Sequence, residues 1–167
     1  LNIKYIAHKL TDNGVSWTFP YWTYPKGQFN LIYKDNYYRF YQNNNVLPRT
    51  LLVGEYRIIK DKRQILKTIF SDSFNPRREI ILEDDPKIIK TTADIGDVKI
   101  VDYQPNSIAI SVDSRNNALL LLMDNYDKGW KASVDGKNVP ILRANYTFRA
   151  IGINEGKHDV KFWYDPW

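Results

Sequence analysis

The sequence predicts a mainly β fold, an antiparallel β-sandwich or a jelly roll, with one short helix. Three observations lead to this prediction: apolar and polar residues alternate in many short segments, turn residues separate these segments, and a single segment has helical spacing. A chain of 167 residues with 43% hydrophobic content can form one sizeable core. We therefore expect a single domain over residues 1–167, with a mixed lobe at about 1–86 and an all-β lobe at about 95–167.

The first lobe begins with short strands separated by turns. Alternation predicts strands at 1–7 and at 16–21, where Trp17, Phe19 and Tyr21 are the apolar positions, and the Pro-Lys-Gly sequence at 25–27 predicts a turn. The tyrosine-rich residues 33–41 favour strand fragments joined by turns. Residues 50–56 are predicted to form an apolar strand that continues past Gly54.

One helix is predicted over residues 61–70. Asp61 is a plausible N-cap, and apolar residues recur three or four positions apart on one face. The Ser-Asp-Ser sequence at 71–73 is expected to end the helix. The acidic residues 83–85, followed by Pro86, indicate a loop.

The second lobe is predicted to consist of strands joined by tight turns. Residues 118–123 form a wholly apolar run, which indicates a strand that is buried on both faces. Asp135-Gly136 is a strong signal for a hairpin turn. Further strands are predicted at 79–82, 98–103, 108–112, 130–134, 139–141, 146–151 and 160–164.

Charge and aromatic content limit the classes of partner. The net charge is +5, and the basic residues are scattered rather than gathered in one run, which argues against nucleic acid. A mildly basic surface suits anionic lipid headgroups or anionic glycopolymers, or simply solvent. Aromatic residues make up 14% of the chain, which fits sugar-binding surfaces and all-β cores alike.

Residues that carry common chemistries are sparse. The chain has no cysteine, and His8 and His158 lie far apart and outside any metal-binding motif, so we expect no metal and assign both histidines structural roles. The eight glycines form no phosphate-binding loop, and we expect no cofactor. Asp124, Asp127 and Asp135 are candidates for the paired carboxylates of glycoside hydrolysis, but their turn-like spacing favours local backbone hydrogen bonds. No catalytic residue is therefore assigned.

Six residues are the candidates for a ligand-binding site near one end of the second lobe. A tryptophan at the start of a strand can stack on a sugar or cap the core, and the second role is favoured. Guanidinium and amide groups in and next to the Ala144-to-Ala150 segment can hold hydroxyl, carboxylate or phosphate groups, or can fix strand ends through buried hydrogen bonds. The candidates are Asp124, Tyr126, Trp130, Arg143, Asn145 and Arg149. Arg49, after Pro48, is considered a structural clamp between the lobes.

The segment from Met123 to Pro166 resembles the closing part of YfhO-type bacterial membrane proteins. Residues 43–61, the opening residues 1–9 and residues 75–86 also resemble parts of that family. The resemblance implies a polytopic glycosyltransferase that uses lipid-linked sugars outside the cytoplasmic membrane. Its catalytic acids would lie in loops outside this sequence, so none is carried over. The chain has no apolar segment near 20 residues, and we expect it to be the extracytoplasmic part of a longer protein, next to its transmembrane region.

Our leading hypothesis is a non-catalytic extracytoplasmic domain that positions a glycan acceptor or stabilises the membrane enzyme, in the modification of a cell-envelope polysaccharide or glycopolymer. Whether the fragment has any enzymatic activity is left open. The expected partners are the transmembrane region, a glycan or anionic glycopolymer, and the nearby membrane surface. The alternatives are an independent carbohydrate-binding module and a purely structural protein-interaction domain.

Overall fold

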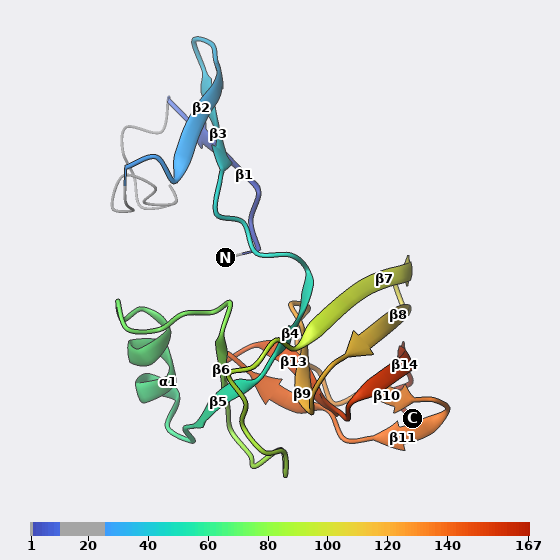
Figure 1. Ribbon diagram of the computed structural model, residues 1–167. Helices are drawn as coiled ribbons and strands as arrows, with labels where there is room; N and C mark the ends of the chain where they lie inside the picture. The colour runs from blue at the N-terminus through green and yellow to red at the C-terminus, as the bar shows by residue number, and fades with distance from the viewer. Residues whose placement is uncertain (1, 11–25) are drawn as a thin grey trace. The chain divides into compact units, whose positions relative to one another are not determined.

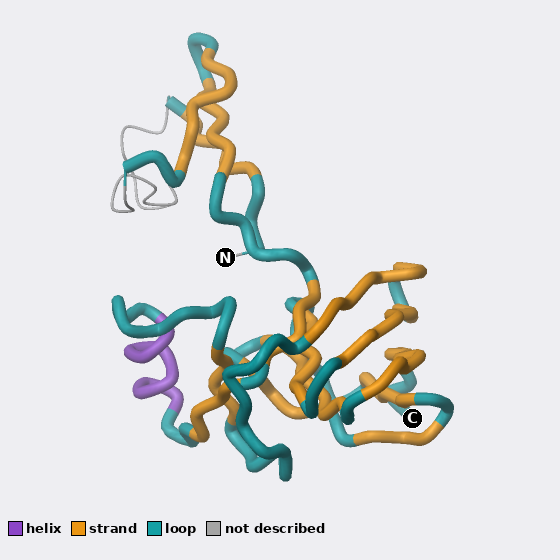
Figure 2. Tube along the Cα trace, in the orientation of Figure 1, coloured by secondary structure: helices purple, strands orange, loops and turns teal. Residues whose placement is uncertain are grey.

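The computed structural model describes residues 2–10 and 26–167 and divides the chain into two compact units, Leu1–Pro48 and Arg49–Trp167. The described residues contain fourteen strands and one helix (Figures 1 and 2). The predicted mainly β fold with one short helix is therefore confirmed.

The first unit contains a three-stranded antiparallel sheet with the order β1-β3-β2. Its strands are β1 (Tyr5–Lys9), β2 (Phe29–Lys34) and β3 (Tyr38–Asn43). The turn between β2 and β3 is held by Asp35, whose Oδ1 accepts hydrogen bonds from the backbone N–H groups of Tyr37 and Tyr38. The strand predicted at residues 16–21 lies outside the described residues.

The second unit contains two sheets. The five-stranded sheet is antiparallel throughout, and in the six-stranded sheet only β5 and β6 pair in parallel. In spatial order, the first sheet consists of β11 (Lys137–Val139), β10 (Trp130–Val134), β14 (Gly156–Tyr164), β8 (Ser107–Ser114) and β7 (Gly96–Gln104). The second consists of β4 (Thr50–Val53), β9 (Ala118–Leu122), β13 (Phe148–Ile153), β12 (Leu142–Ala144), β6 (Glu79–Leu82) and β5 (Glu55–Ile58).

Gly54 interrupts the apolar strand that was predicted over residues 50–56. The halves of that strand, β4 and β5, form the two edges of the six-stranded sheet although one residue separates them, so this sheet must fold back on itself. The carbonyl oxygen of Gly54 accepts a 3.0 Å hydrogen bond from Thr91 N. A Cβ atom at position 54 would lie 2.3 Å from the carbonyl oxygen of Thr91, so only glycine permits this close approach.

The predicted helix is confirmed as α1 (Lys62–Ile69), with Asp61 as its N-cap. The Asp61 carboxylate accepts a 2.8 Å hydrogen bond from Gln64 N, which satisfies one of the free N–H groups of the first turn. Ile65 is the fully buried residue of the helix.

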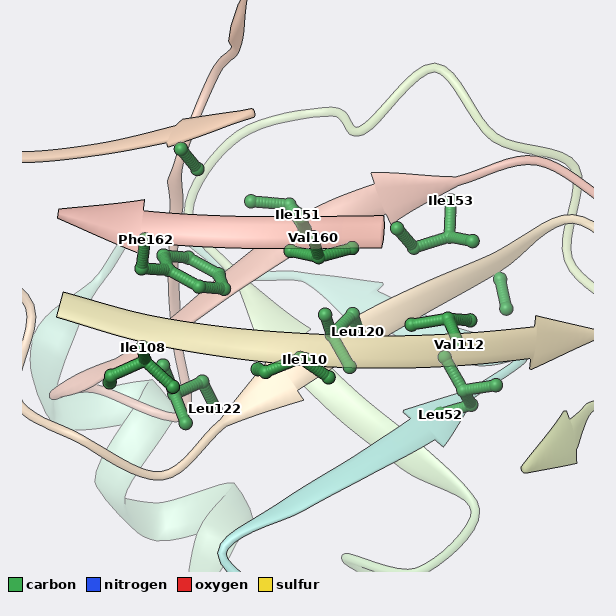
Figure 3. Close-up of a cluster of buried hydrophobic side chains, with 12 residues drawn as sticks. Leu52, Ile108, Ile110, Val112, Leu120, Leu122, Ile151, Ile153, Val160 and Phe162 are labelled. Carbon is green, nitrogen blue, oxygen red and sulfur yellow. The ribbon is translucent and has the colours of Figure 1, made fainter. Parts of the chain in front are cut away.

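The main core lies between the two sheets of the second unit, which gives the predicted sandwich (Figure 3). Alternate residues of β8 and β14 face alternate residues of β9 and β13, because successive side chains of a strand point to opposite faces. β9 is buried at all five positions, as its apolar run predicts. The core residues are Leu52, Ile108, Ile110, Val112, Ala118, Leu120, Leu122, Ala132, Ile151, Ile153, Val160 and Phe162.

The turn between β10 and β11 is formed by Asp135 and Gly136, as predicted. Both have positive φ angles, 51° and 76°, which a two-residue hairpin with the right-handed strand twist requires. β13 begins at Phe148, two residues later than predicted, because Asn145 and Tyr146 have φ angles of 47° and 74° and form a left-handed turn.

Candidate ligand-binding site

The strongest concentration of polar interactions in the candidate site surrounds Asp124, which follows β9. Arg149 enters this region from the start of β13, Trp130 from the start of β10, Tyr103 from the end of β7 and Arg49 from the residue before β4. The two sheets of the sandwich therefore both contribute side chains. We call Arg49, Tyr103, Asp124, Trp130 and Arg149 the arginine cluster.

Arg149 is the buried cation of this cluster. Its side chain is 2% exposed, because it shares the inward face of β13 with Ile151 and Ile153. The guanidinium carbon lies 3.9 Å from the centroid of the Trp130 ring, which is a cation–π contact, and Nη2 lies 3.3 Å from Oδ2 of Asp124. Burial lowers the pKa of Arg149, and the charge of Asp124 opposes this effect. Within the described residues, Nε and Nη1 of Arg149 have no hydrogen-bond partner.

Asp124 is held by three donors. Its Oδ1 accepts a 2.7 Å hydrogen bond from Nη1 of Arg49, and its Oδ2 accepts a 3.0 Å hydrogen bond from the Tyr103 hydroxyl as well as the contact from Arg149. Arg49 also lies over the Tyr103 ring, with 4.8 Å between its guanidinium carbon and the ring centroid. Burial, followed by the hydrogen bond to Asp124, raises the pKa of the Tyr103 hydroxyl.

The charges of the arginine cluster do not cancel. Two guanidinium groups face one carboxylate, so the cluster carries an excess of one positive charge. Arg49 is the accessible cation, because its side chain is 47% exposed whereas that of Asp124 is 12% exposed. The arrangement can therefore present a positive charge to an anionic or hydroxyl-rich ligand, while its carboxylate is already occupied by donors.

Tyr126 and Arg143 form a second pair. Tyr126 lies in the same loop as Asp124, and Arg143 lies in β12. The guanidinium carbon of Arg143 lies 4.7 Å from the Tyr126 ring centroid, and Nε lies 3.8 Å from a carboxylate oxygen of Glu83. The Arg143 side chain is 35% exposed. This second cation is therefore positioned by stacking, and its ion pair is long enough to leave donors available.

Asn145 fixes the backbone and does not join the arginine cluster. Its side-chain oxygen accepts a 2.8 Å hydrogen bond from Ile81 N, and its own N–H donates to the Ile81 carbonyl at the same distance. The residue is 8% exposed. This geometry corresponds to the alternative role considered from the sequence, in which the polar residues of this segment fix strand ends.

The structure also places the other two aspartates that were weighed as catalytic carboxylates. Asp127 accepts a hydrogen bond from Gly129 N at 2.8 Å, and Asp135 binds His158 and Asp159 N at the β10–β11 turn. Both therefore satisfy local groups, as their turn-like spacing predicts. Trp130 packs against the core and on Tyr164, with 5.5 Å between the ring centroids, which is the core-capping role that was favoured.

Sequence reasoning missed Tyr103 and the partner of Arg49. Arg49 was assigned to a clamp between lobes, but Asp124, its partner, is 75 residues away, and Tyr103 is 54 residues away. No local pattern connects these positions, and only the pairing of the two sheets brings them together. The position of Tyr103 at the end of the strand predicted at residues 98–103 was the one available signal for it.

The fold and this cluster define a mainly β domain that presents stacked arginines at one end of a sandwich. A family model described as "Bacterial membrane protein YfhO" matches residues 79–167, which is just over half of the chain. The chain therefore belongs to the YfhO family of bacterial membrane proteins. No curated protein and no solved structure matches the chain. Among residues 2–10 and 26–167, no helix combines the length and the apolar character needed to cross a bilayer.

Proposed function

We propose that this chain is a non-catalytic, extracytoplasmic domain of a YfhO-family membrane protein, and that it positions a glycan acceptor during the modification of a cell-envelope glycopolymer. Family membership supports the association with a membrane protein. The extracytoplasmic location and the glycan ligand are what we propose in addition.

One observation carries the proposal: two partly exposed arginines each lie over a tyrosine ring. Arg49 lies on Tyr103, and Arg143 lies on Tyr126. A cation–π contact restricts the position of a guanidinium group, and the N–H groups that bind no neighbouring residue can donate to a ligand; in Arg49, Nη1 already donates to Asp124. Carboxylate and phosphate groups of an anionic glycopolymer match this geometry, and sugar hydroxyls can accept the same donors.

A second candidate function is stabilisation of the membrane enzyme, without any ligand. The buried Arg149 favours this alternative, because its guanidinium group contacts both Trp130 and Asp124. Such contacts can stabilise the end of the sandwich without binding any ligand. The two candidates differ in whether Arg49 and Arg143 contact a ligand.

The test is an NMR titration of the 167-residue chain with a short anionic glycopolymer, a sugar-bearing glycerol phosphate oligomer, and in parallel with a neutral oligosaccharide. We expect saturable shifts for Tyr103, Tyr126 and their neighbours. Arg49→Gln and Arg143→Gln should each weaken binding about tenfold, since a hydrogen bond to a charged group contributes about 1.5–3 kcal/mol.

Arg115→Gln is the matched control. Arg115 is also an exposed arginine paired with a carboxylate, that of Asp94, but it lies outside the arginine cluster. It should leave the titration unchanged. Absence of saturable shifts with both ligands, in a folded protein, would contradict acceptor positioning and favour the stabilising role.

A further inference from the structure

Helix α1 has an exposed face that combines basic and apolar side chains. Lys62, Arg63, Leu66, Lys67 and Phe70 are all exposed, and at 100° per residue they fall on one side of the helix, with Leu66 and Phe70 between the cations. Phe70 continues the helical pattern, because its N–H donates to the Leu66 carbonyl at 3.1 Å. We call these five residues the basic face of α1.

The apolar residues of this face are unusually accessible. Phe70 is 74% exposed and Leu66 is 38% exposed, while the neighbouring Ile65 is fully buried. The helix therefore packs on its own unit through Ile65 and turns two large apolar side chains to the solvent. In Figure 1, α1 lies on the side of its unit that is opposite to β10 and β11.

Positive charge is concentrated around the same helix. Residues 57–78 contain seven lysines and arginines and two aspartates, so this segment alone accounts for the net charge of +5 of the whole chain. Arg57 is neutralised by two hydrogen bonds to Glu79. Among the residues that the structure describes, Lys62, Arg63 and Lys67 are in no ion pair.

An open depression of about 540 Å³ adjoins the basic face, and Arg63 and Lys67 are among its lining residues. Two hydroxyl groups that also line it, those of Thr68 and Ser71, already donate to backbone carbonyls. The donors left for a ligand include the guanidinium group of Arg63 and the ammonium group of Lys67, which suit a phosphate.

We propose that the basic face of α1 docks on an anionic phospholipid surface. Lys62, Arg63 and Lys67 would lie among the phosphate headgroups, and Leu66 and Phe70 would enter the boundary between headgroups and acyl chains, as in amphipathic helices that lie on membranes. The YfhO family consists of membrane proteins, so such a surface is at hand. This inference goes beyond the proposed function, because its residues are separate from the arginine cluster.

The apolar pair distinguishes a lipid surface from an anionic polymer. A polymer in water would engage the three cations but would leave Phe70 and Leu66 exposed. Burial of a phenylalanine or leucine side chain in an apolar phase is favourable by about 1.5–3 kcal/mol, and only the lipid surface offers that phase.

Co-sedimentation with vesicles tests the proposal. The 167-residue chain is mixed with phosphatidylcholine vesicles and with vesicles that also contain about a third phosphatidylglycerol, and the salt concentration is varied around 0.1 M. We expect binding to the anionic vesicles only, with an affinity that falls as salt is added.

Two variants separate the contributions of charge and apolar contact. The triple variant Lys62→Gln, Arg63→Gln, Lys67→Gln should lower the affinity about 100-fold, since each basic residue near an anionic surface contributes about fivefold. Phe70→Ser keeps every charge and should lower it about tenfold. The control is Lys128→Gln, Lys137→Gln, Lys161→Gln, which removes the same charge from exposed lysines elsewhere and should have a much smaller effect.

Several outcomes would overturn the proposal. These are equal binding to neutral vesicles, equal loss in the control triple variant, or an unchanged affinity of Phe70→Ser. Binding to a glycerol phosphate polymer but not to vesicles would also overturn it and would leave the arginine cluster's proposed role intact. Circular dichroism of each variant checks that the fold is retained.

Discussion

At the scale of single residues, the pairing of Arg149 with Asp124 is the feature with the largest consequence for stability. A guanidinium group that is 2% exposed retains its charge at low cost only if a carboxylate and an aromatic face compensate for lost water. Asp124 has a second cation, Arg49, whereas Asp124 is the one carboxylate in an ion pair with Arg149 among the described residues. Loss of Asp124 therefore leaves Arg149 without a charged partner, whereas loss of Arg149 leaves Asp124 paired with Arg49.

This inequality predicts different effects of two substitutions. Asp124→Asn leaves the buried cation uncompensated and should lower the free energy of unfolding by about 3 kcal/mol. Arg149→Met removes that cation, leaves Asp124 bound to Arg49 and Tyr103, and should cost less, on the order of 1 kcal/mol. Urea denaturation measures both. A larger loss for Arg149→Met would contradict this account and would assign the stabilisation to stacking on Trp130.

At the scale of elements, local patterns predicted most strands, the helix and the Asp135-Gly136 turn, because alternation, capping and turn chemistry act over a few residues. The sequence did not reveal the break at Gly54, because the reason for it is a contact with Thr91, 37 residues later. The candidate residues Asp124, Trp130 and Arg149 were chosen from local patterns near strand ends, and their binding of a ligand stays a prediction. Tyr103 and Arg49 joined them only through the pairing of sheets.

His158, a residue of β14, contacts the turn between β10 and β11. Its Nδ1 lies 2.7 Å from Oδ2 of Asp135, and its Nε2 lies 3.2 Å from the Asn154 carbonyl oxygen. Both ring nitrogens face acceptors, so only the protonated ring can donate to both. The hydrogen bond to Asp135 accordingly raises the pKa of His158, and the same bond lowers the pKa of Asp135.

These shifts predict how stability depends on pH. Because the pKa of His158 is higher in the folded state, its stabilising contribution is complete below the unfolded value of about 6.5 and is lost as pH rises through the folded value. The wild-type protein should therefore lose more stability than His158→Gln between about pH 6 and pH 8. Urea denaturation of both proteins at the two pH values measures this difference. Identical losses would show that the pair contributes nothing to folding.

At the scale of the whole molecule, the second unit contains both sheets of the sandwich, the core and every residue of the arginine cluster. The family match, residues 79–167, also falls entirely within this unit. The basic face of α1 and the arginine cluster are separate sets of residues on it. The two proposals therefore assign two separate surfaces to this unit, one to a glycan acceptor and one to the membrane.

The proposed role with an envelope glycan requires that the domain lies outside the cytoplasm, which is the central claim. The chain has no cysteine, so a single Lys137→Cys substitution in an exposed strand provides a unique label within it. The measurement is labelling of this cysteine by a membrane-impermeant maleimide, in cells that express the membrane protein carrying this chain and have no other reactive cysteine in that protein. We predict equal labelling in intact and permeabilised cells. Labelling only after permeabilisation would place the domain in the cytoplasm and contradict the proposed role with envelope glycans.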